Sequence, residues 1–491
     1  MRARFPTDTG AGHTLAMAPG DAARLLHRLT SYAPDREWTD PLDDPRLRHD
    51  LVPNDPATLP PPVKRYAGEL PVTPLPRELP PTPLRATAVL AGAVPPETAV
   101  PDLAAVARLL YLSAGVVRTA ERNGRPVLYR AAGSAGARFP LEVYLAARGI
   151  PGLADGVHWY DPQAHALVRI GPAPTGEVST IVVTGVPWRT GWRYSERGYR
   201  HLYWDAGTLL AQQTALAASV GLAARLRTVF PDATVTELVG ADGVHEFPLA
   251  LLSLGDGVPA IVPTGPATAG EIDRDPPEFG LITATQRAGD GVELGEPWAA
   301  GAPLSGDVPP SPMLDEVILR RGSTRRMDPG TTVGTGVLDW ALAAATRGIE
   351  FPQYVAVHGV EGREPGLYDP SGRAVTTGDL RAELRRICLD QGLGGDAAYV
   401  VISAADLSRV DDRGYREAQL AAGLVEGRLH LAAYALGAGA SGMTFLDSEI
   451  PGLLGTGDAA MLFTCVGVPE YASRPGGRPG EPVAVRVVTP R

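Results

Sequence analysis

Two stretches of this chain, residues 197–221 and residues 413–437, are copies of one pattern. The first reads RGYRHLYWDAGTLLAQQTALAASVG and the second reads RGYREAQLAAGLVEGRLHLAAYALG. They align at a constant offset of 216 residues and need no insertion. The matched positions are Arg197, Gly198, Tyr199, Arg200, Ala206, Gly207, Ala217 and Gly221, with Arg413, Gly414, Tyr415, Arg416, Ala422, Gly423, Ala433 and Gly437. A repeat carried once per half indicates a duplicated domain rather than a solenoid of short units. We therefore expect the two halves to pair as an internal dimer.

The length of the chain sets its domain organisation. A chain of 491 residues exceeds what one hydrophobic core usually spans, so two domains of about 200 residues with extensions are expected. We place an N-terminal helix and proline-rich extension at 1–86, a first domain at 87–255, a connector at 256–310 and a second domain at 311–491. The proline-rich part is expected to form extended connecting segments, and the connector is expected to hold some hairpins but little other regular structure.

Helical and strand patterns interleave in both halves. In the first half, helices are expected over 20–32, 103–116 and 198–222, and strands over 141–147, 179–186 and 247–255. In the second half, helices are expected over 311–321, 337–348, 380–392 and 415–438, and strands over 354–360, 397–405 and 460–468. Several connections are too short for parallel crossovers. We therefore predict an α+β fold of two mixed sandwich domains rather than a doubly wound sheet.

Composition excludes several classes of function. The formal net charge is −10 and no basic stripe is present, which argues against a nucleic-acid groove. No stretch approaches the roughly 20 apolar residues of a membrane span, and no signal-like segment follows the first residues, so a soluble, cytoplasmic protein is expected. The histidines lack metal-ligand spacing, and Cys388 and Cys465 lie in apolar runs typical of a core. We expect neither a metal site nor a disulfide framework.

One short segment could bind a phosphate group. Arg321, Ser323 and Arg325 alternate in RRGSTRRM, so in an extended stretch their side chains point the same way and could hold an anion. In a chain this rich in arginine, a solvated helix end is the alternative. Further along, a long helix ends in the small residues of 437–442, which would let a flat ring approach the backbone, and Arg474 follows the last strand.

These residues resemble the nitroreductase-like flavoprotein family. Its members carry an R-x-S-x-[RK] segment after the first helix, a small-residue helix end beside the flavin ring, and a "vG.p" strand followed by basic residues. The matching residues here are Arg321, Ser323, Arg325, the 437–443 stretch, Val466 to Pro469 and Arg474. The resemblance implies an FMN cofactor, with Ser441, Gly442 and Arg474 among its binding residues.

The first half resembles the azole-forming branch of that superfamily, the peptide thiazoline/oxazoline dehydrogenases. The matching segments are Gly133-Ser134-Ala135-Gly136-Ala137, then GVHWYDP at 156–162, then WRYSERGYR at 192–200. Gln212 lies on the long helix where the family often has an amide facing the ring, and a plain interfacial glutamine is an equal alternative. The resemblance covers most of residues 100–255 and 311–478.

The two halves have lost different parts of the family pattern. The first half has the Ser134/Gly136 loop but no R-x-S-x-R near 83–90, whereas the second half keeps that segment and has ATRGIEFP at 345–352 in place of the loop. Because the family builds flavin sites across a dimer, the resemblance implies one complete site. We expect one FMN per chain at the interface between the halves, held by second-half arginines and covered by the 133–137 loop.

The segment Trp192-Arg193-Tyr194 is the candidate acid/base element. The branch has a lysine–tyrosine pair there, so the arginine is a departure from its pattern. Arg193 stays charged, so it can lower the pKa of Tyr194 or orient it but cannot accept a proton. Tyr194 is therefore the candidate base, and an aromatic side chain at a half-buried strand end is the alternative.

The resemblance implies an FMN-dependent dehydrogenase that oxidises thiazoline or oxazoline rings in a ribosomally made peptide. The implied partners are the precursor peptide and cyclodehydratase proteins, with the proline-rich 33–86 segment and the connector as candidate surfaces. Two alternatives stay open. One is an NAD(P)H-dependent reductase of nitro, quinone or enone groups in the same superfamily, and the other is a non-catalytic scaffold that docks peptide after losing flavin.

Overall fold

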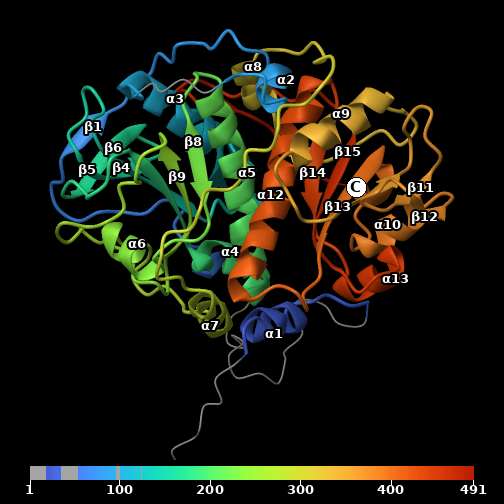
Figure 1. Cartoon of the computed structure of the whole chain (residues 1–491), viewed down its shortest axis with the longest axis horizontal. Helices are drawn as coiled ribbons and strands as arrows, with labels where there is room; N and C mark the ends of the chain where they lie inside the picture. Colours follow the sequence, from blue (N-terminus) through green and yellow to red (C-terminus); the bar gives the residue numbers. More distant parts are fainter. Residues whose placement is uncertain (1–17, 35–53, 96–99, 123, 491) are drawn as a thin grey trace, which may run out of the picture.

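The computed structural model describes residues 18–34, 54–95, 100–122 and 124–490. Figure 1 shows two layered halves side by side, with the long helices α5 (Gly198–Ala218) and α12 (Asp412–Ala435) between them. The first residues of the sequence and part of the proline-rich segment lie outside the described residues. In the part of the chain that is described, no helix is long and apolar enough to cross a membrane.

The N-terminal half is built on a seven-stranded antiparallel sheet in the order β1-β6-β5-β4-β7-β9-β8. Its strands are β1 (Val72–Pro74), β4 (Leu141–Ala147), β5 (Gly156–Asp161), β6 (Ala166–Gly171), β7 (Thr180–Gly185), β8 (Ala224–Arg227) and β9 (Phe247–Leu254). Successive side chains of a strand point to opposite faces of the sheet. Thus Val143 and Leu145 enter the core that reaches the central helices, and Tyr144 and Ala146 enter a smaller core on the far face.

The C-terminal half repeats this design with a six-stranded antiparallel sheet in the order β12-β11-β10-β13-β15-β14. Its strands are β10 (Gln353–Val357), β11 (Gly366–Tyr368), β12 (Ala374–Thr377), β13 (Tyr399–Ala405), β14 (Gly439–Met443) and β15 (Ala459–Gly467). Tyr399 and Val401 enter the same core as Val143 of the other half. One hydrophobic core therefore runs through both halves.

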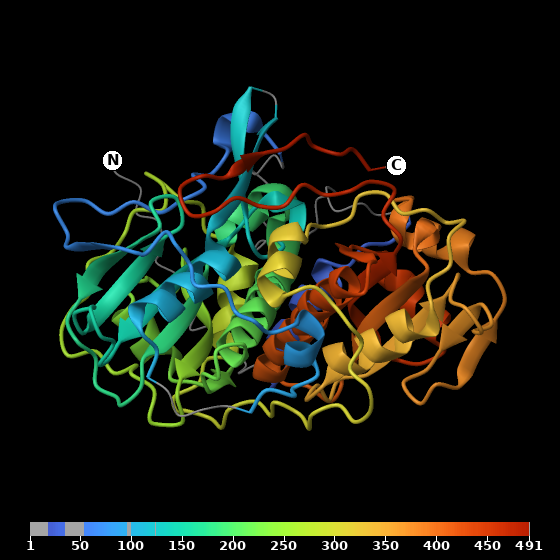
Figure 2. The same ribbon diagram turned by 90° about the horizontal axis from the view of Figure 1, so that it is seen from above.

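A third, small sheet joins the end of the chain to the N-terminal half. The hairpin β2 (Val116–Arg122) and β3 (Arg125–Arg130) is antiparallel, and β16 (Val483–Ala484) pairs with β2 in parallel. Figure 2 shows the C-terminal tail crossing from the second half to this hairpin. The last residues of the chain thus tie the two halves together.

Helices surround the sheets and the central pair. Besides α5 and α12, they are α1 (Asp21–Leu29), α2 (Ala86–Leu90), α3 (Leu103–Ala114), α4 (Pro187–Tyr194), α6 (Asp232–Leu238), α7 (Gly280–Ala288), α8 (Leu314–Arg320), α9 (Thr335–Thr346), α10 (Arg381–Ile387), α11 (Leu393–Asp396) and α13 (Ile450–Leu454). The predicted connector therefore contains a helix, α7, rather than hairpins alone. The proline-rich extension is likewise more than a connector, because its strand β1 pairs with β6 at the edge of the first sheet.

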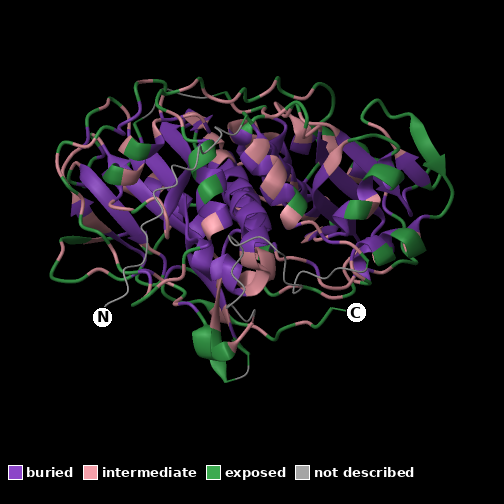
Figure 3. Cartoon of the chain, turned by 90° about the horizontal axis from the view of Figure 1, so that it is seen from below, coloured by how far each residue is buried: buried purple, intermediate pink, exposed green. Residues whose placement is uncertain are grey.

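The two long helices cross at glycines that the repeat makes equivalent. A Cβ built on Gly207 would lie 2.4 Å from the Gly423 carbonyl carbon, and one built on Gly423 would lie 2.4 Å from the Trp204 carbonyl oxygen. Only glycine permits backbones to approach this closely. Figure 3 shows both helices coloured as buried over most of their length, since they lie between the two halves.

The arginines that open each repeat bind an aspartate of the opposite half. Arg197 and Arg200 reach Asp447 at 2.6 and 2.5 Å. In the mirror arrangement, Arg413 and Arg416 reach Asp232 at 2.7 and 2.9 Å. The two repeat-equivalent tyrosines, Tyr199 and Tyr415, stack between these clusters with ring centroids 6.5 Å apart and planes at 4°. The halves thus exchange buried ion pairs about a pseudo-two-fold axis, which confirms the predicted α+β pseudo-dimer.

Candidate functional site

Arg321 lies at the junction of the two halves. It follows α8, and its Nη2 donates a hydrogen bond of 2.5 Å to the Ala131 carbonyl of the N-terminal half. In return, Arg118 of β2 donates to the Arg321 carbonyl at 3.1 Å. Gly133 lies against the same guanidinium, since a Cβ built on it would be 3.4 Å from Nη1 of Arg321. The structure therefore brings Arg321 and the loop that contains Ser134 into one region, as the sequence predicts.

The guanidinium of Arg321 is buried without an ion pair. Its residue is 4% exposed, its Nε has no hydrogen-bond partner, and no salt bridge to it is found among the described residues. Burial, together with the neighbouring Arg118, lowers the pKa of Arg321 to about 10. An anion placed here would recover electrostatic energy lost on desolvation. The donor set therefore fits an anionic group such as a phosphate.

Ser323 and Arg325 continue from Arg321 in an extended segment. Ser323 forms a parallel bridge with Ala440, and the Arg325 N–H donates to the Tyr471 hydroxyl at 2.9 Å. Thr324, between them, is buried, which agrees with an alternation of side-chain directions. Across residues 54–95, 100–122 and 124–490, no hydrogen bond or ion pair engages the Ser323 hydroxyl or the Arg325 guanidinium. Both groups are thus free to bind a ligand.

The loop 133–139 of the N-terminal half has a strained backbone. Gly136, Ala137 and Phe139 have φ of 59°, 55° and 48°, a region that side-chain-bearing residues rarely adopt. Asp205 of α5 holds the loop, because its carboxylate accepts hydrogen bonds from the Ser134 hydroxyl at 2.5 Å and from the Ala135 N–H at 2.9 Å. The Ser134 hydroxyl is therefore used within the protein, and Ser134 can meet a ligand only through its backbone.

Arg193 and Tyr194 lie directly behind this loop. A Cβ built on Gly136 would be 2.6 Å from the Tyr194 hydroxyl and 2.8 Å from Cδ of Arg193. Tyr194 is the last residue of α4, so the alternative of a strand end is wrong. Its ring packs against the His201 ring with centroids 4.0 Å apart. The loop, α4 and α5 together fix the position of the phenol.

The ionisation of Tyr194 differs from the expectation. Burial raises the pKa of Tyr194, and it outweighs Arg193 and Arg325, which lower it. Arg193 therefore acts in the predicted direction but does not decide the outcome, because desolvation of the phenolate costs more. Tyr194 is a neutral phenol near pH 7, suited to donate a proton. Arg325 of the C-terminal half lowers the pKa of Tyr194 of the N-terminal half, so groups of both halves contribute to the electrostatics of this region.

The remaining predicted residues divide into two groups. Ser441 is buried in β14, and Gly442 faces α12, where a Cβ would lie 2.3 Å from Oε1 of Glu426. Gln212 donates its amide to the Leu112 carbonyl of α3, within the N-terminal half, at 2.7 Å. The guanidinium of exposed Arg474 donates to the Ala484 carbonyl at 3.1 Å in the C-terminal tail. The structure thus brings Gly442 toward Arg321, but not the side chains of Gln212 and Arg474.

Three polar residues of the central helices escaped the sequence analysis. Asp205 lies on α5 behind the loop, and burial raises its pKa well above the usual range. On α12, Glu426 acts electrostatically on both Arg321 and Asp205, and it lies 3.4 Å from Nε2 of His430. Their positions within the repeat favoured a purely structural interpretation. Because both helices carry several other charged and polar residues, no local pattern in the sequence singled out Asp205 or Glu426.

The pseudo-symmetric counterpart of this region is filled by protein. After α2, which corresponds to α8, a Cβ built on Gly92 would lie 2.4 Å from Nη1 of Arg347. Arg347 in turn donates to the Gly301 carbonyl at 3.1 Å, and Leu304 N–H donates to the Ala91 carbonyl at 2.8 Å. The connector therefore packs over the counterpart position. The region around Arg321 differs in that its guanidinium, whose Nε has no hydrogen-bond partner, lies against Gly133 in a loop of the other half.

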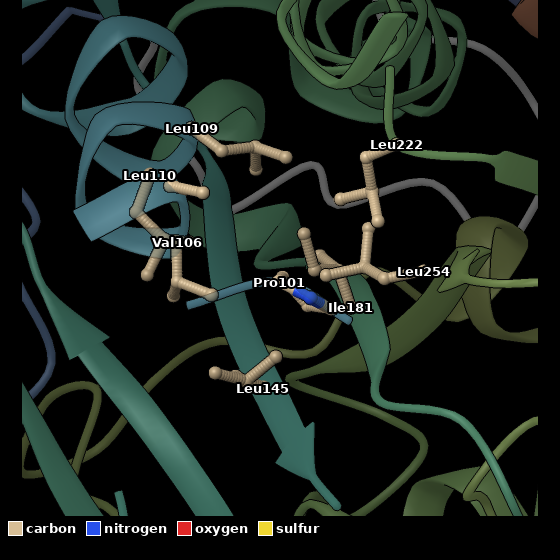
Figure 4. A pocket seen from close by; sticks show the side chains of 9 residues that line it. Pro101, Val106, Leu109, Leu110, Leu145, Ile181, Leu222 and Leu254 are labelled. Atoms are coloured by element: carbon tan, nitrogen blue, oxygen red, sulfur yellow. The ribbon is translucent and has the colours of Figure 1, made fainter. Parts of the chain in front are cut away.

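An apolar hollow in the N-terminal half is separate from this region. Figure 4 shows that its lining comes from α3, β4, β7, β9 and the residues flanking the helices α3 and α5. The lining residues are Pro101, Ala105, Val106, Leu109, Leu110, Leu145, Ile181, Leu222 and Leu254. Because none of them carries a polar side chain, this hollow lacks the groups that orient a reactive ligand.

Known proteins support the same class of fold. No protein-family model matches the chain. A candidate nitroreductase of Methanocaldococcus jannaschii is 27% identical over 165 residues, which span 30% of this chain and 78% of the relative. The crystal structure of a candidate nitroreductase from Anabaena variabilis superposes with a TM-score of 0.68 at 23% identity, covering 91% of this chain and 99% of that one.

A third similarity is too weak to carry an argument. The Escherichia coli microcin synthetase complex with a truncated precursor bound aligns at 16% identity and a TM-score of 0.27, covering 49% of this chain and 82% of that one. The superposition over nine-tenths of the chain establishes the fold alone. The sequence match, at 27% identity, is to a protein that is likewise described as a candidate nitroreductase.

Proposed function

We propose that this chain is an FMN-dependent oxidoreductase that binds one flavin at the junction of its two halves. The observation that carries the proposal is the buried guanidinium of Arg321, which lacks an ion pair and faces a strained loop of the other half. Arg321, Ser323 and Arg325 would hold the phosphate group. Gly136 lets the loop backbone pack directly on Arg193 and Tyr194, because a side chain there would collide with both.

We further propose that the substrate is a thiazoline or oxazoline ring in a ribosomally made peptide. The support is the resemblance of the loop 133–137 and of residues 192–200 to the azole-forming branch. A bound flavin would supply the hydride-accepting chemistry of such an oxidation. Tyr194 would take up the proton lost from the ring only in its minor phenolate form, which Arg193 and Arg325 would stabilise. The proline-rich segment and the connector are proposed surfaces for the peptide and for cyclodehydratase partners.

A second candidate is an NAD(P)H-dependent reductase of nitro, quinone or enone groups. The observation that favours it is that Tyr194 is protonated at neutral pH, as an ordinary tyrosine is, and that burial raises its pKa rather than lowering it. A reductase needs a proton donor at this position, whereas an azoline dehydrogenase needs an acceptor. The two candidates therefore use the same residue in opposite protonation states.

The absorption spectrum of the purified protein is the first test, because a bound flavin gives visible bands. Arg321→Ala should weaken FMN binding by about 10- to 100-fold, since it removes charge-assisted hydrogen bonds. Arg326→Ala, one residue beyond the segment, is the matched control and should keep the flavin. Equal flavin content in the two variants would contradict the assigned phosphate site. A colourless wild-type protein that still binds a precursor peptide would instead select the scaffold alternative.

A second measurement separates the two activities. Tyr194→Phe should retain FMN but lose formation of azoles from an azoline peptide, and an unchanged rate would remove Tyr194 from the mechanism. Rapid bleaching of the flavin by NADPH, without azole formation in aerated solution, would select the reductase.

A further inference from the structure

Asp205 lies on α5 behind the loop 133–139 and has no assigned role in the proposed reaction. It is 4% exposed, and it lies on the face of α5 that also carries His201 and Thr208, one turn away on either side. His201 packs on the Tyr194 ring, and the Thr208 hydroxyl donates to the Gly133 carbonyl at 3.2 Å. One helical face therefore touches both the strained loop and the candidate phenol.

The contacts of Asp205 form a continuous path to Tyr194. The carboxylate accepts one hydrogen bond from the Ser134 hydroxyl and one from the Ala135 N–H, and the Ser134 hydroxyl in turn accepts the Phe139 N–H at 2.7 Å. These bonds fix both ends of a turn that contains three residues of positive φ. At the middle of the turn, Gly136 packs on the Tyr194 hydroxyl and on Arg193.

A second contact joins the loop to α4. Nε of Arg138 donates to the Arg189 carbonyl at 3.1 Å, and its guanidinium lies 4.5 Å from the centre of the Trp192 ring. A shift of the loop must therefore move the end of α4. Because a backbone of this conformation persists only where the surroundings hold it, the loop would relax once the carboxylate bonds are lost.

We infer that Asp205 is a positioning residue, which holds the loop 134–139 in its strained form and through that loop sets the place of Tyr194. The inference deepens the proposed function and rests on it for the role of Tyr194. Asp205 makes no hydrogen bond to the phenol, so it positions Tyr194 through the loop, and its charge in addition raises the pKa of Tyr194.

Hydrogen–deuterium exchange of the protein as purified tests the path without any catalytic assay. In Asp205→Ala, amide exchange should rise by about tenfold or more in residues 131–140, because the hydrogen-bond acceptor for the loop is lost. It should also rise in residues 187–198. Asp205→Asn can still accept the Ala135 N–H, so it should restore most of the protection. Thr214→Ala, on the same helix but bonded only to its own turn, is the control and should change neither segment.

Unchanged exchange in 187–198 when 131–140 is deprotected would overturn the inference, because the loop would then move without α4. Should Asp205→Ala fail to fold, the same criterion applies to Ser134→Ala, which removes one of the two bonds.

Kinetics of the flavin-loaded protein provide a second readout. Asp205→Ala should lower kcat by roughly tenfold with KM little changed, and it should have no further effect in a Tyr194→Phe background, as expected for coupled residues. Independent, multiplying losses would contradict the inference. If the wild-type protein binds no flavin, the proposed function fails, and the exchange measurement still decides the role of Asp205.

Discussion

The close crossing of α5 and α12 gives the most direct test of the fold. In Gly423→Ala, the added methyl group would lie 2.4 Å from the Trp204 carbonyl oxygen and 2.7 Å from the Trp204 Cα. An ordinary contact begins near 3.4 Å, so the helices must part by roughly 1 Å at this point. A gap of that size forfeits about a quarter to a half of the dispersion energy of each facing atom pair.

Two effects of opposite sign determine the magnitude. Overpacking of a well-packed site costs about 1–3 kcal/mol, whereas alanine is favoured over glycine inside a helix by about 1 kcal/mol. The neighbours at Gly423 are backbone atoms that cannot rotate away, so the upper part of the range applies and a net loss of about 1–2 kcal/mol remains. Gly207→Ala meets backbone at the same 2.4 Å and should behave alike.

Thermal unfolding followed by circular dichroism measures this loss. For domains of 150–250 residues, each kcal/mol corresponds to roughly 2–4 °C in Tm, so a decrease of several degrees is expected. Gly336→Ala is the matched control, because Gly336 lies in α9 and a Cβ there meets nothing within 4 Å. It should leave Tm unchanged or raise it slightly. The reasoning is refuted if Gly423→Ala is as stable as this control.

Two further substitutions test buried charges. Burial would raise the pKa of Asp447, but its paired arginines outweigh burial and hold it well below 3.8. Its ion pairs should therefore stabilise the protein above about pH 4 and weaken as the pH falls below that value. Asp447→Ala should cost about 3–5 kcal/mol at pH 7 and flatten the acid limb of the stability profile, and an unaltered limb in urea titrations would contradict this. Lys64 pairs with Glu246 at 2.5 Å, and both side chains are buried. Lys64→Ala should therefore lower the free energy of unfolding by a similar amount. The control is Arg65→Ala at the exposed neighbouring residue, which should unfold like the wild-type protein.

The sequence predicted the elements that depend on local patterns. The repeat identified both central helices, and long apolar runs identified the middle strands of each sheet. The edge elements escaped, because β1 and β16 have three and two residues and pair with partners far away in the chain. Helix α7 escaped because residues rich in proline and glycine flank it on both sides.

The same distinction applies to the candidate site. Arg321, Ser323 and Arg325 could be recognised because their spacing is local. Asp205 could not, since its partner Ser134 lies 71 positions away and no periodicity links the two. The ionisation of Tyr194 was beyond reach for a similar reason: desolvation depends on every segment packed around the phenol, and the adjacent arginine alone could be read from the chain.

The exchanged ion pairs of the central helices bear on how such a chain can change over time. Each half contains two arginines whose aspartate partner lies in the other half. Loss of either half would therefore leave two cations of the remaining half without a counter-charge. Both halves are therefore needed to neutralise these buried charges. After duplication, sequence change is consequently less constrained in the loops than at the buried ion pairs that join the two halves.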